Sequence, residues 1–220
     1  MADQLTLAFD TSAAHCAAAL VWGDTVLAVQ VEEMAKGQAE RLMPLLEEVL
    51  AGAGKTWGDL DRLGVGTGPG NFTGIRIAVS AARGLALSLG IPAIGVSSLE
   101  GMAFAPAQTG PVMAVLDARQ GNVYCQIFNQ GGAAHAAPSL CSKMDIPSGS
   151  PQGTLQIIGH NSQDIAARLG ATSVDTAAHD TITAIARIAA QRTPDGSRPA
   201  PLYLRPADAA PPRDPAPVIL

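Results

Sequence analysis

The sequence is poor in cysteine, in positive charge and in long apolar runs, and each shortage excludes a class of protein. The three cysteines, Cys16, Cys125 and Cys141, are odd in number and widely spaced, so they fit neither a disulfide framework nor a Cys-x-x-Cys metal pair. The formal net charge of −5 gives no overall basic field that would attract nucleic acid. The N-terminus does not resemble a signal peptide, and no apolar run reaches the length of a membrane span. We therefore expect a protein of the reducing cytoplasm that does not contact a membrane.

The glycine-rich stretch from Leu63 to Leu89 lacks what a phosphate-binding loop needs. It begins as a short apolar strand, passes through a tight connection and continues as a helix, which Asn71 or Thr73 can cap. Helix N-termini favour phosphate, but no lysine follows these glycines as a P-loop requires, and Gly-x-Gly-x-x-Gly fails at Asn71. The residues alone leave two interpretations open, a ligand-binding turn and a plain strand-to-helix connection.

The chain is long and apolar enough to bury a core, in one domain or in two compact halves. Apolar residues make up 47% of it. Two prolines and a glycine within residues 105–111 suggest a boundary between halves. Eight of the 16 prolines lie among the last 27 residues, which predicts an extended tail with Tyr203 and Leu204 docked on the body. The predicted units are an N-terminal half over 1–105, a smaller C-terminal half over 106–193 and the tail over 194–220.

Hydrophobic periodicity and turn residues predict alternating strands and helices. In the N-terminal half we expect strands at Leu5–Phe9, His15–Trp22, Thr25–Val31, Leu63–Val65 and Ile91–Val96, and helices at Gln38–Ala51, Phe72–Leu89 and from Ser97 or Ser98 to Phe104. In the C-terminal half we expect strands at Val112–Asp117, Asn122–Phe128 and Leu155–Gly159, and helices at Ser162–Leu169 and Thr176–Gln191. Residues 129–153 should be irregular with one strand at most, and the last helix could return to cover the first half.

Four blocks make the sequence resemble one known family over nearly its whole length. The specific block is Gly68-Pro-Gly-Asn-Phe-Thr-Gly-Ile-Arg76, with Ala8-Phe-Asp-Thr-Ser12 before it. Asp117-Ala-Arg-Gln-Gly-Asn-Val-Tyr124 and Pro201-Leu-Tyr-Leu-Arg205 come after it. Together they resemble the TsaB family, also called YeaZ, bacterial partners of TsaD in making the threonylcarbamoyl modification of the tRNA adenosine beside the anticodon. Family members commonly carry Glu where this chain has Asn122, so that position receives no charge-based role.

The resemblance implies both a fold and a role. The implied fold is a reduced version of the duplicated actin-like ATPase (ASKHA) fold, an α/β architecture with mixed sheets, flanking helices and a smaller second half. The implied role is a non-catalytic subunit that binds TsaD and is required for threonylcarbamoyl transfer, within a complex that also includes the ATPase TsaE. Because this chain is acidic, tRNA would be bound only through the complex.

One departure from the pattern of TsaD concerns catalysis. In TsaD, the helix that corresponds to Gln38–Ala51 is expected to carry two histidines four residues apart that bind a catalytic metal. Aligned through Ala39–Pro44, this chain has Gln38 and Leu42 at those positions, and leucine cannot ligate a metal. The four histidines stand apart in the sequence and are expected to be surface or satisfied residues. We expect no cofactor or metal on this chain alone, and ATP and metal in the partner subunits.

The two long helices of the N-terminal half are expected to form half of a four-helix interface with TsaD. Apolar side chains from both helices would make its centre, and arginines would make its polar rim. The same surface could pair with a second copy of the chain when TsaD is absent. The expected partner-binding residues are Arg41, Leu42, Leu45, Leu46, Val49, Phe72, Ile75, Arg76, Val79 and Arg83.

Two alternatives to the partner subunit stay open. One is a self-sufficient actin-like ATPase or phosphotransferase, and the other is a peptidase, because related proteins were once labelled glycoproteases. The peptidase is poorly supported, since the chain has neither His-x-x-x-His nor His-Glu-x-x-His. The ATPase must compete with plain turn chemistry, in which Asp and Ser bond nearby amides. Its nucleotide-binding residues, vestigial if the chain is a partner subunit, would be Asp10, Thr11, Ser12, Gly68 and Gly70.

Overall fold

The computed structural model describes residues 3–104, 110–147, 153–175 and 177–205, and these residues form two five-stranded sheets with flanking helices. The first part of the chain forms β1 (Leu5–Asp10), β2 (His15–Trp22), β3 (Thr25–Glu33), α1 (Gln38–Gly52), the 3-10 turn η1 (Trp57–Asp59), β4 (Arg62–Gly66), α2 (Phe72–Leu89), β5 (Ala93–Val96) and α3 (Ser98–Ala103). The second part forms β6 (Val112–Asp117), β7 (Asn122–Phe128), β8 (Ser139–Ser142), β9 (Gln156–Gly159), α4 (Ser162–Leu169), β10 (Thr172–Val174) and α5 (Ala178–Gln191).

The two sheets repeat one topology. The first has the strand order β3-β2-β1-β4-β5, and the second has the order β8-β7-β6-β9-β10. In each, the first three strands pair antiparallel in sequence order, the fourth pairs parallel with the first, and the fifth pairs parallel with the fourth. The second half is reduced, because among the described residues no helix stands between β8 and β9 where α1 stands between β3 and β4.

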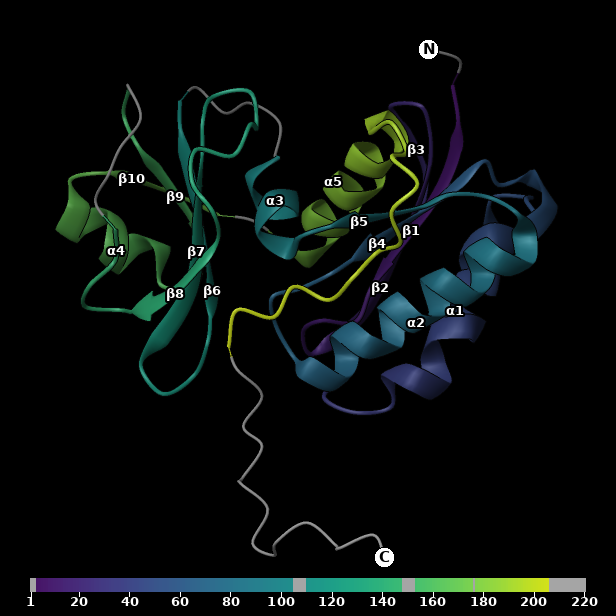
Figure 1. Cartoon of the computed structure of the whole chain (residues 1–220), viewed down its shortest axis with the longest axis horizontal. Coiled ribbons are helices and arrows are strands. Elements are labelled where there is room, and N and C mark those ends of the chain that lie inside the picture. Colours follow the sequence, from purple (N-terminus) through teal and green to yellow (C-terminus); the bar gives the residue numbers. More distant parts are fainter. Residues whose placement is uncertain (1–2, 105–109, 148–152, 176, 206–220) are drawn as a thin grey trace, which may run out of the picture.

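The layers run helix, sheet, helix, sheet, helix across the molecule (Figure 1). Helices α1 and α2 cover one face of the first sheet, and α5 covers its other face. Strand β1 shows why two faces can be buried, because Leu5, Leu7 and Phe9 point toward α1 and α2 while Ala8 points toward α5. Small residues let α5 approach closely, since a Cβ on Gly64 would lie 2.8 Å from Cβ of Ala189.

The last helix of each half packs on the sheet of the other half. Helix α3 follows β5 but contacts β6, β7 and β9, and Leu99 and Met102 join the core of the second sheet. Helix α5 follows β10 but contacts β1, β2 and β4. Since α3 and α5 also contact each other, this central layer joins the two halves (Figure 1).

Local signals in the sequence account for the ends of α2. The side chain of Asn71 accepts hydrogen bonds from the main-chain N–H groups of Thr73 and Gly74, which confirms Asn71 as the N-cap. Gly90 ends the helix in the left-handed conformation, with φ of 70°. The sequence missed β10, whose three residues include the exposed Thr172 and Ser173 and carry no apolar alternation. In the described part of residues 129–153, β8 is the one strand, as expected.

By length and composition alone, α2 is the one helix among the described residues that could cross a membrane, although Arg76 and Arg83 interrupt its apolar residues. Such a match is a weak indicator, because the core helix of a soluble protein passes the same test. Ile75 and Val79 of α2 are buried in the core beside α1 and the first sheet.

The predicted boundary at 105–111 falls largely on residues 105–109, outside the described residues, so the domain limits stay predictions.

Candidate functional site

A cleft of about 1180 Å³ lies between the two halves and is lined by both of them. The first half contributes the turn after β1 and the glycine-rich turn before α2, including Asp10, Ser12 and Gly70. The second half contributes the turn after β6, including Asp117 and Arg119. The two Asp-containing turns that the sequence singled out therefore face the same space from opposite sides.

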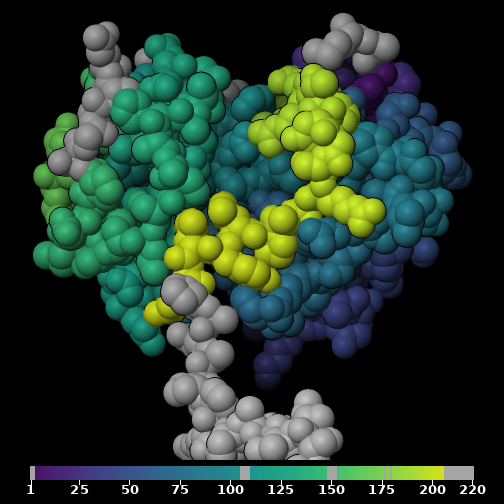
Figure 2. Space-filling model, viewed as in Figure 1, coloured from purple at the N-terminus to yellow at the C-terminus, as the bar shows by residue number. Residues whose placement is uncertain are grey.

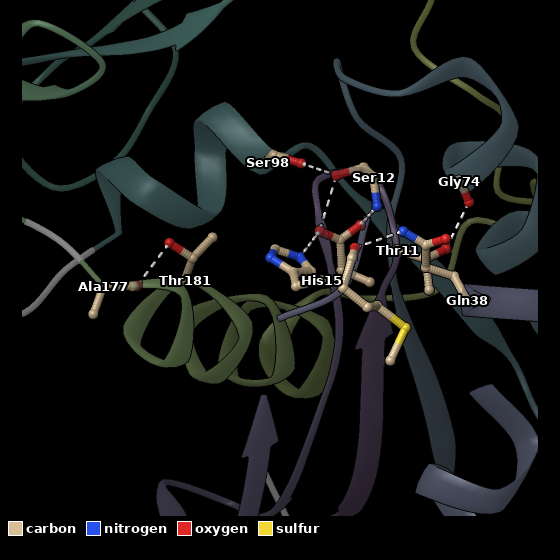
Figure 3. Close-up of polar contacts among 10 residues, drawn as sticks. Thr11, Ser12, His15, Gln38, Gly74, Ser98, Ala177 and Thr181 are labelled. Carbon is tan, nitrogen blue, oxygen red and sulfur yellow. Dashed lines mark hydrogen bonds and ion pairs between the residues drawn. The ribbon is translucent and has the colours of Figure 1, made fainter. Parts of the chain in front are cut away.

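Asp10 ends β1 and is almost fully enclosed, with 3% of its surface exposed. Its Oδ1 accepts the main-chain N–H of Ser12 at 3.0 Å, and its Oδ2 accepts the hydroxyl of Ser12 at 2.9 Å. Nε2 of His15 lies 3.1 Å from the same Oδ2, and the Ser12 hydroxyl reaches that of Ser98 on α3 at 3.2 Å (Figure 3). The carboxyl group is therefore held from within its own hairpin.

The glycine-rich turn packs directly against this hairpin turn. The main-chain N–H of Asn71 donates to the carbonyl of Ser12 at 2.6 Å, and the Thr11 hydroxyl donates to the carbonyl of Gly74 at 2.6 Å. A Cβ on Gly70 would collide with the Ser12 carbonyl, and one on Gly74 would collide with the Thr11 carbonyl. These glycines are thus required by backbone-to-backbone packing inside the protein.

This geometry limits what Asp10 can do chemically. A carboxylate has about four acceptor positions, and three of them are directed at Ser12 and His15. Thr11 faces Gly74 instead of the cleft. Among the described residues no cluster of three or more His, Cys, Asp or Glu side chains could hold a metal ion. The contacts of Asp10, Thr11 and Ser12 are those of plain turn chemistry, which the sequence left open as the alternative to a nucleotide site.

The wall of the cleft that the second half forms is more exposed to solvent than the first-half turn. Oδ1 of Asp117 accepts the main-chain N–H of Arg119 at 3.2 Å and lies 3.6 Å from Nε2 of His160. Nearly half of the Asp117 side chain is exposed, at 47%. Arg205 reaches this wall from the C-terminal segment and donates to the carbonyl of Ala118.

Sequence reasoning did not find the side chains that complete the first turn. His15 stands five residues after Asp10 and was expected to be a surface or satisfied residue, and its hydrogen bond to Asp10 makes it a satisfied one. Ser98 is 86 residues away from Ser12, and no local signal links them. Only the tertiary fold, which places the start of α3 beside the turn after β1, brings these hydroxyls together.

The structure corrects the apolar centre that was expected for the partner interface. These six side chains are between 0% and 3% exposed and belong to the chain's own core. They cannot also contact a second protein without unfolding, because the same atoms already pack between the two helices and the first sheet. The corrected residues are Leu42, Leu45, Leu46, Val49, Ile75 and Val79.

The three arginines that were expected at the interface rim have partners within the chain. Arg41 pairs with Glu32 of β3 at 2.6 Å and with Glu48 of α1 at 2.5 Å. Its hydrogen bonds hold the pKa of both carboxyls below the ordinary value. Nε of Arg76 donates to the hydroxyl of Tyr203 at 3.0 Å, and Nε of Arg83 donates to the carbonyl of Pro199 at 2.7 Å.

Charged and polar residues such as Glu47 and Arg76 are exposed on α1 and α2, and between them lie exposed apolar and small residues. Leu87 is 83% exposed, Met43 is 37% exposed and Phe72 is 39% exposed. A Cβ on Gly84 would meet no heavy atom within 4 Å. Of the apolar residues that were predicted for the interface, Phe72 is the one that is exposed; the other exposed apolar residues of these helices were not predicted.

The predicted docking of Tyr203 and Leu204 is confirmed. The ring of Tyr203 lies 4.8 Å from that of Phe72, centroid to centroid, and Leu204 packs against the core beside the second sheet. Figure 2 shows the C-terminal segment lying across the front of the molecule between the two halves.

Two of the cysteines meet in the folded chain. Sγ of Cys125 on β7 lies 3.3 Å from Sγ of Cys141 on β8, as a pair of free thiols. Burial raises the pKa of the Cys141 thiol to about 12 and that of Cys16 to about 11. These thiols are therefore poor nucleophiles near neutral pH.

Comparison with known proteins gives one family and several relatives. The family model of TsaD, described as tRNA N6-adenosine threonylcarbamoyltransferase, matches residues 28–146. TsaB of Escherichia coli is 40% identical over 121 residues, which are 54% of this chain and 52% of that protein. TsaB of Bacillus subtilis is 38% identical over 123 residues, 56% of this chain and 54% of that protein. The chain thus spans about half the length of the curated TsaB proteins that it matches.

Solved structures are similar over more of the chain. The structure described as YeaZ from Pseudomonas aeruginosa is 25% identical with a TM-score of 0.72, and the alignment covers 91% of this chain and 100% of that one. Component A of (R)-2-hydroxyglutaryl-CoA dehydratase from Acidaminococcus fermentans is 10% identical with a TM-score of 0.56, and the alignment covers 86% of this chain and 98% of that one. At this identity the likeness concerns the fold alone. With the repeated topology of the two sheets, these likenesses confirm the predicted duplicated, actin-like α/β fold.

Proposed function

The chain belongs to the TsaB (YeaZ) family, and on that premise we propose that it is a non-catalytic subunit that pairs with TsaD in tRNA threonylcarbamoyladenosine biosynthesis. In this proposal the chain acts in the cytoplasm as one component of the threonylcarbamoyltransferase complex. It meets TsaE and tRNA only through that complex, and ATP and metal are held by the partner subunits.

The observation that carries the proposal is the solvent-facing surface of α1 and α2. This surface combines an exposed Leu87, a partly exposed Met43 and open space over Gly84, so a partner helix can approach closely. The chain itself matches the TsaD family model, so TsaD should present an equivalent pair of helices. Two such pairs would form a four-helix interface, and a second copy of this chain is the weaker competitor for the same surface.

The first turn supports a non-catalytic role. An ATPase needs an acid that is free to hold metal and a cation placed for the transferring phosphate. Asp10 is instead engaged by Ser12 and His15, and Leu42 stands where TsaD is expected to carry a metal-binding histidine. These contacts weigh against the self-sufficient ATPase, although Asp10 and Asp117 both line the cleft.

The test is the affinity of the purified chain for TsaD of the same organism, with and without Mg-ATP. We expect tight one-to-one pairing and no nucleotide binding by the isolated chain. The proposal fails if the isolated chain does not pair with TsaD but binds or hydrolyses nucleotide, and if Asp10→Ala abolishes that binding.

Charge substitutions test the surface itself. Leu87→Asp should fold normally, because that side chain is 83% exposed, and should weaken pairing with TsaD about 100-fold. An unpaired carboxylate in a buried interface costs about 3 kcal/mol, and each 1.4 kcal/mol is about tenfold in Kd. The matched control is Met144→Asp, at a 77% exposed position of the second half, which should bind like wild type. Unchanged affinity in a folded Leu87→Asp variant would place the interface elsewhere.

A further inference from the structure

The C-terminal residues 199–205 span the cleft between the two halves. This segment follows α5 and forms no helix or strand, yet it contacts residues from both halves of the molecule. Leu202, Tyr203, Leu204 and Arg205 also line the cleft. Figure 2 shows the segment, in yellow, running from the first half across to the second.

The first-half end of the segment is held by main-chain and side-chain contacts together. The N–H of Leu202 donates to the carbonyl of Thr67 at 2.9 Å, and Arg83 donates to the carbonyl of Pro199 at 2.7 Å. The ring of Tyr203 packs beside Phe72, and the guanidinium carbon of Arg76 lies 3.7 Å from the centroid of that Phe72 ring.

The second-half end depends on fewer groups. Leu204 packs against the cluster formed by α3 and the second sheet. Arg205 donates to the carbonyl of Ala118 at 3.4 Å and to Oε1 of Gln120 at 2.7 Å, both in the turn between β6 and β7. No main-chain hydrogen bond between this end and the second half is found among the described residues.

We propose that residues 199–205 form a latch that restrains the two halves across the cleft and that releases first at its second-half end. The halves are also joined through the α3–α5 layer, so the latch adds a further restraint and resists their rotation about that layer. The two ends act in series, since one continuous segment joins them, and the end with fewer contacts releases first. All of the latch contacts lie within this chain, so the isolated chain suffices to test it.

The test measures the distance between the halves in the full chain. Leu87→Cys on α2 and Met144→Cys in the second half are both highly exposed and can carry nitroxide labels, whereas the raised thiol pKa of Cys16 and Cys141 disfavours labelling there. In the Arg205→Ala variant, double electron–electron resonance should show a second population at longer distances. Hydrogen exchange at the Leu202 amide should stay slow, because the first-half end remains docked.

Two further variants separate the latch from a merely docked tail. Gln120→Asn draws the acceptor of Arg205 back by one methylene and keeps a residue that tolerates the φ of 52° found there, so it should open the cleft as Arg205→Ala does. Arg198→Ala, an exposed arginine one residue before the latch, should leave the distances unchanged. The latch is refuted if Arg205→Ala and Gln120→Asn both keep the wild-type distance distribution, or if the Leu202 amide loses its protection together with the Arg205 contacts.

Discussion

Two turns occupy equivalent places in the two halves of this molecule. Asp10-Thr11-Ser12 follows β1, and Asp117-Ala118-Arg119 follows β6, each leading into an antiparallel partner strand. The first turn is sealed by the glycine-rich turn before α2, and Asp10 is 3% exposed. Among the described residues, Arg205 reaches the second turn but no glycine-rich turn packs on it, and the Asp117 side chain is 47% exposed.

The difference teaches that repeating a topology does not repeat its chemistry. In the first half, three glycines, Gly66, Gly70 and Gly74, let the chain lie closer to the Asp10 carboxylate and to the carbonyls of Ser12 and Thr11 than a side chain would allow. In the second half, His160 follows β9 at the place where Thr67 follows β4, and the chain there approaches Asp117 without closing over it. The first turn has become part of the core, whereas the second remains a wall of the cleft.

The largest expected effect comes from breaking the seal of the first turn. Gly74→Ala would place a Cβ against the carbonyl of Thr11, a main-chain atom that cannot move aside, and should cost about 3 kcal/mol of unfolding free energy. Gly84→Ala in the same helix is the control. It meets open space and should stabilise the protein by about 0.5–1 kcal/mol, since glycine is a poor helix former. Urea unfolding of the two variants gives both values, and equal stabilities would show that the seal is unimportant.

A smaller effect should separate the two aspartates. Asp10→Ala leaves the N–H and hydroxyl of Ser12 without their buried acceptor, and should cost about 2–3 kcal/mol. Asp117→Ala removes one exposed hydrogen bond and should change stability by less than about 0.5 kcal/mol. Both are measured by urea unfolding at neutral pH, with circular dichroism to verify the fold. If Asp117→Ala costs as much as Asp10→Ala, the proposed contrast between a sealed and an open turn is wrong.

The smallest expected effect is the pH dependence of stability that the ion pairs of α1 produce. Among the described residues, α1 has no counterpart in the second half. Arg41 of α1 holds the pKa of Glu32 and Glu48 below their ordinary value of 4.5, so folding favours the ionised carboxyls. Their contribution to stability is therefore present above about pH 4.5 and is lost as the pH falls through the lowered values. Wild type and Arg41→Ala should differ most at neutral pH and converge in acid, when unfolding midpoints are compared across that range. A constant difference from pH 7 to pH 3 would contradict this. The effect should be modest, because these carboxylates are near the surface.

Much of the fold could be predicted from local patterns. The alternation of apolar residues located β1, β2, β6 and β7, and the 3.6-residue period located α1 and α2. Asn71 and Gly90 mark the ends of α2 through their own side-chain and backbone preferences, so neighbouring residues suffice to place them. The sequence did not predict the short β10, because β10 is a strand through its pairing with β9 and its composition gives no strand signal.

The candidate site could be predicted only in part. The sequence identified Asp10, Ser12 and Asp117, but their environments depend on residues far along the chain, such as Ser98 and Arg205. The interface prediction failed for Leu42, Leu46 and their neighbours because periodicity tells that a face is apolar, not whether a sheet or a second protein covers it.

The amino-acid order by itself determined the local elements, the caps, the acidic charge and the family of this protein, because each of these depends on residues close in sequence or on composition. The tertiary structure alone decided that the apolar faces of α1 and α2 are core, that Asp10 is sealed while Asp117 is open, and that residues 199–205 span the cleft. The physical reason is that burial and hydrogen-bond satisfaction depend on which distant segments meet, and chain folding alone brings those segments together.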